Sequence, residues 1–155
     1  MVALLVSIIS AGFTYRQMHD AQTATVLGMK PSVDFYTGDD DDMPTAGIRI
    51  MNGGPGVATI KGLTYYVDRK PVSDQDAAAE RFKAASDKVR YFSFDNGDSL
   101  AVNEKPWLFY IRRREVTKQQ FENFIDFIDN HVAIKVEYCS EQGECWPKCS
   151  TPHMC

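Results

Sequence analysis

The chain has 155 residues, of which 44% are hydrophobic, and it carries a formal net charge of −4 at pH 7. This length fits one domain of ordinary size, which can bury an apolar core without metal or disulfide support. The small negative charge excludes the overall basic footprint of a nucleic-acid-binding protein, so we expect no nucleic-acid partner.

The first fifteen residues carry no charged side chain, and Arg16 begins an ordinary polar chain. An apolar leader of this kind is typical of membrane anchors and export signals. It is shorter than the roughly 20 residues that a spanning helix needs, although Tyr15 can lie at the headgroups and Arg16 can reach water. We expect residues 1–15 to contact the membrane as a single-pass helix. A cleaved signal peptide and a buried core helix are the alternatives.

Behind the leader, residues 19–29 have helical spacing and continue the first helix, which ends before Pro31 because a residue preceding proline leaves the α region. Two further segments have helical spacing. One covers residues 73–89, with Ser73 and Asp76 able to cap its start, and the other follows a capping box of Thr117 and Gln120. Alternating or β-branched runs predict strands at residues 33–37, 48–52, 57–67, 91–94, 107–114 and 132–138.

Strands at a spacing of about ten residues, with turn residues between them, are typical of antiparallel sandwiches. We therefore expect a mainly β (α+β) fold: an antiparallel Ig-like β-sandwich with two short helices, preceded by an N-terminal membrane helix. In this organisation residues 1–29 form the anchor helix and its polar continuation. Residues 30–148 form the sandwich, and residues 149–155 form a C-terminal tail.

Two loops invite a chemical interpretation. The run Gly53-Gly54-Pro55-Gly56 is not a phosphate-binding loop, because no Gly-Lys-Ser/Thr follows and the next element is a strand. We expect a turn that requires positive φ there. The run Asp39-Asp40-Asp41-Asp42 lacks the alternating spacing of a calcium loop, so we interpret it as a solvated loop and expect neither a metal site nor a cofactor.

Four cysteines lie near the C-terminus, at Cys139, Cys145, Cys149 and Cys155. An even, tightly clustered set fits two disulfides, for which three connectivities exist. Cys139 and Cys145 can pair if Gln142-Gly143 forms a hairpin turn, because cross-strand Cβ atoms lie within disulfide reach. Free thiols, and a zinc site of all four thiolates with His153 as a substitute ligand, are the alternatives, although the five-residue gaps fit zinc poorly.

The run Arg112-Arg113-Arg114 is the one basic cluster in the sequence. If the strand continues through it, Arg112 and Arg114 share one face and are candidates for contact with anionic headgroups. The alternative is a solvated strand end whose charges pair with Glu115 or nearby Asp side chains.

The stretches Asn52-Gly53-Gly54-Pro55-Gly56-Val57-Ala58-Thr59-Ile60-Lys61 and Tyr66-Val67-Asp68-Arg69-Lys70-Pro71-Val72 resemble an uncharacterised group of bacterial membrane-anchored proteins. Its Tyr-x-Ser…Glu-x-Trp pattern is similar to Tyr138-Cys139-Ser140, Glu144 and Trp146, and Arg69 stands where that group has glycine. The resemblance implies an N-terminal hydrophobic helix and an anchored β-rich domain, with no known activity.

These observations predict a membrane-anchored binding module with a protein partner, and no residue is assigned a catalytic role. An envelope enzyme or metal-dependent hydrolase using Asp39–Asp42 or His131, and a structural subunit of a membrane complex, are the alternatives. We expect a single-pass membrane protein, in the inner membrane if the cell is Gram-negative. Arg16 and Lys30 favour a cytoplasmic domain and the clustered cysteines an oxidising compartment, so we lean to the extracytoplasmic side.

Overall fold

The structure is a computed structural model that describes residues 14–18, 29–40, 45–83 and 86–155. Residues 14–18 are helical and their side chains are exposed. Most of the expected anchor helix and of its continuation, residues 1–13 and 19–28, lies outside the described residues. Within the part that is described, no helix is both long and apolar enough to cross a membrane.

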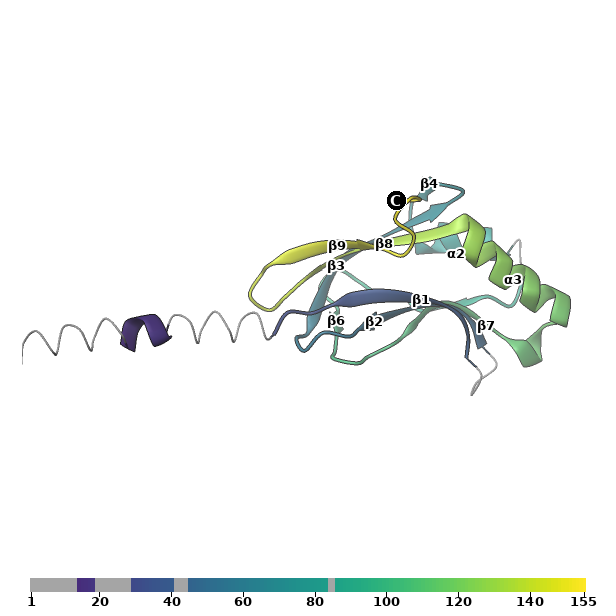
Figure 1. Cartoon of the computed structure of the whole chain (residues 1–155). Helices are drawn as coiled ribbons and strands as arrows, with labels where there is room; N and C mark the ends of the chain where they lie inside the picture. Colours follow the sequence, from purple (N-terminus) through teal and green to yellow (C-terminus); the bar gives the residue numbers. More distant parts are fainter. Residues whose placement is uncertain (1–13, 19–28, 41–44, 84–85) are drawn as a thin grey trace, which may run out of the picture.

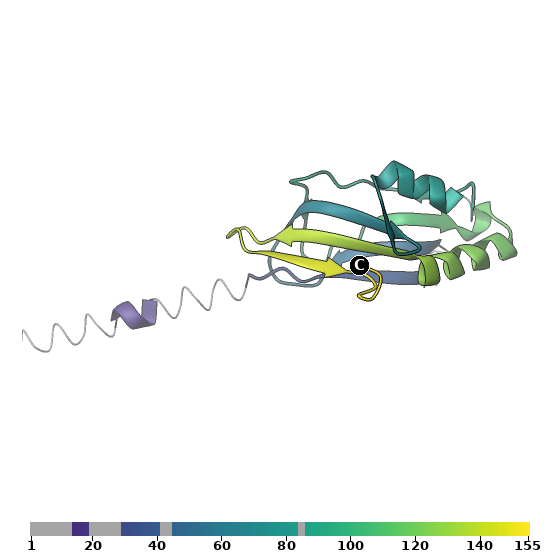
Figure 2. The ribbon, with the colours of Figure 1, turned by 90° about the horizontal axis from the view of Figure 1, so that it is seen from above.

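Two antiparallel sheets make up most of the domain, which confirms the mainly β (α+β) prediction (Figure 1). Sheet A has the strand order β1-β2-β7-β5, and sheet B has the order β4-β3-β8-β9, with β6 also paired to β3. Figure 2 shows β3, β8 and β9 lying side by side in sheet B. The bounds in sheet A are β1 Val33–Asp40, β2 Thr45–Asn52, β5 Arg90–Tyr91 and β7 Trp107–Arg112. Those in sheet B are β3 Ala58–Val67, β4 Lys70–Val72, β6 Ser99–Leu100, β8 Val132–Cys139 and β9 Cys145–Cys149.

Two helices, α2 (Gln75–Lys83) and α3 (Lys118–His131), lie together at the end of the domain opposite the start of β1 (Figure 1). Phe82 of α2 stacks on Phe109 of β7, with ring centroids 4.2 Å apart. Phe109 also meets Tyr65 of β3 edge to face at 5.5 Å, so the sheets contact each other through their inner faces. The helices therefore share one core with both sheets.

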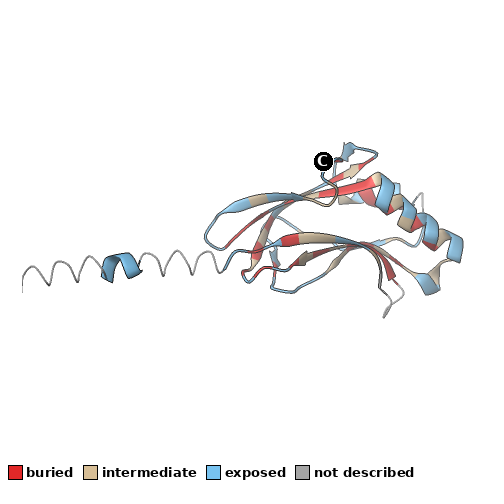
Figure 3. Ribbon diagram, in the orientation of Figure 1, coloured by how far each residue is buried: buried red, intermediate tan, exposed pale blue. Residues whose placement is uncertain are grey.

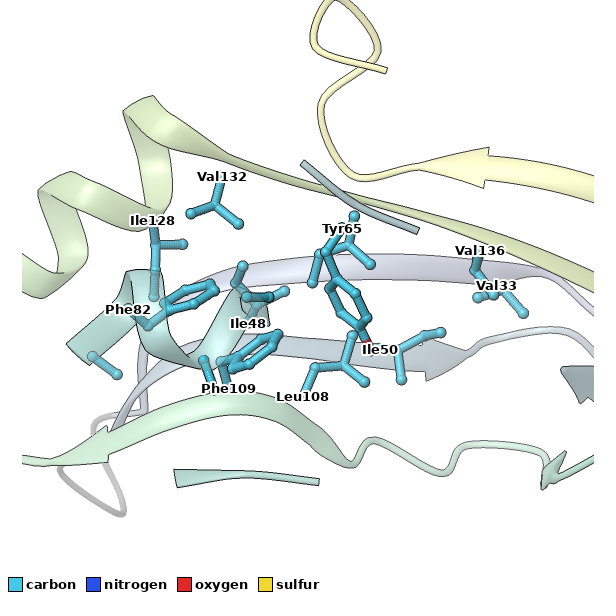
Figure 4. Close-up of a cluster of buried hydrophobic side chains, with 14 of the residues drawn as sticks. Val33, Ile48, Ile50, Tyr65, Phe82, Leu108, Phe109, Ile128, Val132 and Val136 are labelled. Atoms are coloured by element: carbon cyan, nitrogen blue, oxygen red, sulfur yellow. The ribbon is translucent and has the colours of Figure 1, made fainter. Parts of the chain in front are cut away.

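Buried side chains run along the inner faces of both sheets and along the inner sides of the helices (Figure 3). Figure 4 shows this core from Val33 at one end to Ile128 at the other. Tyr65 lies within it, and burial raises the pKa of its phenol well above the ordinary value. The core consists mainly of aliphatic and aromatic side chains, as the alternating strand patterns predict.

Strand β7 departs from simple alternation, because Leu108 and Phe109 are adjacent in sequence and both fully buried. The register explains this: Ile48 pairs with Phe109, whereas Arg49 pairs with Trp107, so Leu108 is an extra residue in the ladder. Such a β-bulge re-aims the side chains on either side of it. It turns Trp107 to the outer face of sheet A, beside Arg49.

The predicted N-cap of α3 is confirmed, whereas the predicted N-cap of α2 is wrong. Helix α3 begins with the expected capping box, in which the Thr117 side chain accepts from Gln120 N and the Gln120 side chain accepts from Thr117 N. Helix α2 is shorter than predicted, and the expected cap at Ser73 is wrong. Asp74 accepts from Ala77 N at 2.7 Å, and this hydrogen bond lowers the pKa of its carboxyl.

The glycine-rich loop after β2 is organised by the fully buried side chain of Asn52. Its Oδ1 accepts from the backbone N–H groups of Ser32 and Gly54, both at 3.1 Å. Its Nδ2 donates to the carbonyls of Gly56 (2.7 Å) and Leu100 (3.1 Å). One side chain thus fixes the loop onto the segment that enters β1 and onto β6.

The prediction that this loop requires positive φ is wrong, since its glycines do not adopt positive φ. They are required by close approach instead. A Cβ on Gly56 would lie 1.6 Å from Met29 O, and one on Gly54 would lie 2.3 Å from Ser32 N. Only residues without a side chain let the loop pack this closely on the chain that leads into β1.

Positive φ occurs in the β3–β4 hairpin, where Asp68 (φ 52°) and Arg69 (φ 64°) form the two-residue turn. This is the geometry of a type I′ turn, which favours Asn-Gly. The strand predicted at residues 91–94 is shorter, and β4 and β9 were not predicted as strands. Cys149, the first residue of the expected C-terminal tail, ends β9, and residues 150–155 fold back over β8, with Met154 buried (Figure 1).

Candidate functional site

The outer face of sheet A carries a row of aromatic and basic side chains. The outward-pointing residues of β1, β2 and β7 include Tyr36, Arg49, Met51, Trp107, Tyr110 and Arg112, and we call the surface formed by these six residues the aromatic face. It depends on the β-bulge in β7, because Trp107 and Tyr110 are three residues apart and would otherwise point to opposite sides.

Cation–π contacts join the members of the aromatic face. The guanidinium of Arg49 lies 4.2 Å from the ring centroid of Trp107, and that of Arg112 lies 5.9 Å from the ring centroid of Tyr110. The rings of Trp107 and Tyr110 are 6.2 Å apart. Contacts of this kind hold the long side chains in one conformation before binding, so these side chains lose less conformational entropy when a partner binds.

The aromatic face is also hollowed. A cavity of about 380 Å³ opens beside Tyr36, Arg49 and Met51, with Lys105 at its rim. Tyr36 is 48% exposed, so its ring is accessible to a partner. The face therefore offers a flat aromatic surface, a small depression and positive charge in one place.

The outer face of sheet B is covered in part by the C-terminal tail. Ser150 N donates to the carbonyl of Ile134, and Ser150 Oγ accepts from Ile134 N, both at 2.9 Å. Ala133 points outward from β8 yet is fully buried, and Met154 is buried near the chain end. The tail thus shields the part of this face around Ala133 from solvent.

The cysteines form two disulfides, Cys139–Cys145 and Cys149–Cys155, so the disulfide interpretation is confirmed over free thiols and zinc. The first bond joins residues that face each other across the β8–β9 hairpin, with Gly143 (φ 86°) in the turn. The second holds the tail beside β9. No described cysteine is left as a thiol.

The three arginines of the basic cluster are not on one continuous strand, because β7 ends at Arg112 and residues 113–115 form a 3₁₀ turn. Arg112 lies 3.6 Å from Glu115, and the guanidinium of Arg113 lies 5.6 Å from the ring centroid of Phe121. The side chain of Arg114 is exposed. Headgroup contact through Arg112 and Arg114 stays a prediction.

The metal-dependent enzyme of the alternative interpretation would use His131 or Asp39–Asp42. His131 Nδ1 lies 2.6 Å from Asp68 Oδ1, and no third ligand from the described residues joins them. Asp39 and Asp40 end β1, and Asp41 and Asp42 lie outside the described residues. Within the described chain, no three His, Cys, Asp or Glu side chains gather closely enough to hold a metal ion.

The sequence contained part of the signal for the aromatic face. The alternation of β2 places Arg49 opposite to the buried Ile48 and Ile50, and could have identified it as outward-pointing. Nothing local indicates the bulge that turns Trp107 outward, and nothing local pairs β2 with β7. The pairing of Asp68 with His131 likewise joins residues 63 positions apart.

No protein-family model matches this chain, and no curated protein or solved structure matches it either. What the molecule does is therefore inferred from its own surfaces. Of those described above, the aromatic face combines the residue types that most often dominate protein interfaces, namely Trp, Tyr and Arg.

Proposed function

We propose that this chain is a single-pass membrane protein that displays an Ig-like β-sandwich, and that the sandwich acts by binding a protein partner through the aromatic face. The supporting observation is the linked row of Tyr36, Arg49, Trp107, Tyr110 and Arg112 on the outer face of sheet A. Side chains of these types are enriched at the centres of protein interfaces, where they bury large areas at a small entropic cost.

A protein partner fits this surface better than a metabolite does. The aromatic face spans three strands, and most of its aromatic and basic side chains lie outside the depression, whereas metabolite sites enclose most of their ligand. Positive side chains at the rim would steer an acidic partner and set its orientation. The apolar leader would hold the domain near the membrane, which raises the local concentration of any membrane partner.

Site-specific photo-crosslinking in producing cells tests this proposal. A benzophenone amino acid is placed at Tyr36 on the aromatic face or, as a control, at the exposed Thr64 on the outer face of sheet B. We expect a discrete adduct of higher mass from position 36 and none from position 64. Equal adducts from both positions, or none from position 36, would contradict the proposal.

A matched pair of charge changes makes the result specific. Arg112→Gln removes a cation from the aromatic face, and Lys61→Gln removes an exposed cation from sheet B. We expect Arg112→Gln to reduce the position-36 adduct several-fold and Lys61→Gln to leave it unchanged. If both variants act alike, the adduct reflects overall charge and not recognition by this face.

We further propose that the domain lies on the extracytoplasmic side, because stable disulfides persist in oxidising compartments. Labelling intact cells with a membrane-impermeant thiol reagent tests this side. We expect the cysteines to be labelled only after reduction. Labelling without reduction, and only after lysis, would place the domain in the cytoplasm.

A further inference from the structure

A second cavity lies between the β3–β4 hairpin, α2 and α3. Figure 1 shows these elements at the end of the domain opposite the start of β1. Its volume is about 420 Å³, within the usual range of small-ligand pockets. We call it the distal pocket. Its walls include Asp68, Lys70, Pro71, Val72, Arg81 and Phe127.

Two cations of the distal pocket have no anionic partner among the described residues. Most described lysines and arginines are held by a carboxylate or an aromatic ring, as Lys148 is by Asp34 and Arg90 by Glu115. Among the described residues, the side chains of Lys70 and Arg81 make no ion pair, hydrogen bond or ring contact. They reach the same pocket from β4 and from α2, so two unneutralised charges face one space.

The one carboxylate of the pocket is already engaged. Asp68 Oδ1 lies 2.6 Å from His131 Nδ1, and Asp68 N donates to His131 O at 2.8 Å. The His131 ring is stacked on Phe127, with centroids 5.4 Å apart. These contacts keep Asp68 in its left-handed conformation and turn its charge toward His131 instead of toward the two cations.

The remaining walls are apolar. Pro71, Val72 and Phe127 give the pocket an aliphatic side and an aromatic side. An inorganic ion alone would leave these surfaces in contact with water, whereas a ligand with an apolar body would bury them. The cations would bind its charged group by charge-assisted hydrogen bonds, in which the fork of Arg81 suits a carboxylate or a phosphate.

We propose that the distal pocket binds a small organic oxyanion, with its charged group held by Lys70 and Arg81 and its apolar body packed against Phe127. This site is separate from the aromatic face and does not depend on the partner proposed for that face.

Titration of the full chain in non-ionic detergent, followed by ¹H–¹⁵N NMR, tests the site. The probes are benzoate, phenyl phosphate and the neutral analogue benzamide. We expect saturable shifts at Lys70, Arg81 and Phe127 with at least one anion, and binding of benzamide about tenfold weaker or less. Tighter binding of phenyl phosphate than of benzoate would assign the oxyanion as phosphate, and the reverse as carboxylate. Benzamide binding as tightly as both anions, or no saturable shift with either, would overturn the proposal.

Variants with equal changes of net charge distinguish anion binding in the distal pocket from a general electrostatic attraction of the anion to the protein. Lys70→Gln with Arg81→Gln should weaken binding of the better anion by about tenfold or more. Lys61→Gln with Arg114→Gln makes the same change of net charge at exposed positions and should leave the affinity within about twofold. Equal losses in both double variants would overturn the proposal.

Asp68→Asn should change the anion affinity in the opposite direction to the Lys70→Gln and Arg81→Gln double variant. Asparagine tolerates the left-handed conformation and can still accept from His131, so the hairpin should be retained. Removal of the one carboxylate in the pocket should strengthen anion binding several-fold. A weaker affinity in this variant, with the NMR spectrum of the fold intact, would also refute the assignment.

Discussion

Replacement of Asn52 by alanine should be among the most damaging single changes in this domain. Its buried side chain makes four hydrogen bonds of 2.7–3.1 Å, to the backbone of Ser32, Gly54, Gly56 and Leu100. Each such bond contributes about 1 kcal/mol net, and a buried partner left unpaired costs about 1–3 kcal/mol. We expect the free energy of unfolding to fall by about 4 kcal/mol, a large part of the 5–15 kcal/mol typical of domains.

Urea denaturation followed by circular dichroism measures this loss. Asn130→Ala is the matched control, because the Asn130 side chain bonds only within α3, to Asp126, and is exposed. That variant should change the unfolding free energy by about 0.5 kcal/mol or less. A loss below about 1 kcal/mol for Asn52→Ala would refute the view that this side chain organises the loop.

Asn52→Asp separates the hydrogen-bond donors of Asn52 from its size. The substitution keeps the shape and the accepting oxygen but replaces the group that donates to the Gly56 and Leu100 carbonyls. At neutral pH it places a buried carboxylate against two carbonyl oxygens, which raises the pKa of that carboxyl. We therefore expect this variant to be severely destabilised at pH 7 and partly recovered as the pH falls and the carboxyl takes up a proton.

Three further changes have defined outcomes. Arg69→Gly should raise the unfolding free energy by about 0.5–1 kcal/mol, because glycine adopts the observed φ of 64° without steric cost, whereas Arg69→Ala should not. Replacing Cys139 and Cys145 together by serine should lower it by about 2 kcal/mol, measured against the oxidised protein, since the bond closes a short loop. The hydrogen bond from Ala77 N lowers the pKa of Asp74 in the folded state. The ionised Asp74 carboxylate therefore stabilises the fold fully at a pH above its unfolded-state pKa. This stabilisation is lost as the pH falls through the lowered pKa of the folded state. Asp74→Asn keeps the cap and should flatten this acid-side loss of stability in pH-dependent melting.

Features whose partners lie within a few residues were predictable from the sequence. The capping box of Thr117 and Gln120 joins residues three positions apart. The Cys139–Cys145 disulfide closes a hairpin with a sequence separation of six. In both cases the backbone geometry of one turn brings the two side chains together, so the contact can be predicted from the residue types and their spacing.

Features that depend on strand order were missed or misinterpreted. The loop at Gly54 and Gly56 was expected to need positive φ, but its glycines are required by the chain that packs against them. The sequence alone does not distinguish a glycine required by positive φ from a glycine required by close packing. The cap of α2 was placed one residue early, because Ser73 and Asp74 are both suitable caps and the helix start depends on its packing.

The sequence by itself predicted the longer strands, the two helices and a possible hairpin disulfide, since hydrophobic period and turn residues act over short distances. Only the tertiary structure decided which outward side chains meet. The bulge at Leu108 sets Trp107 beside Arg49, and the antiparallel return of β8 sets His131 beside Asp68. These contacts depend on register between distant strands, and a shift of one residue would turn every side chain to the opposite face of its sheet.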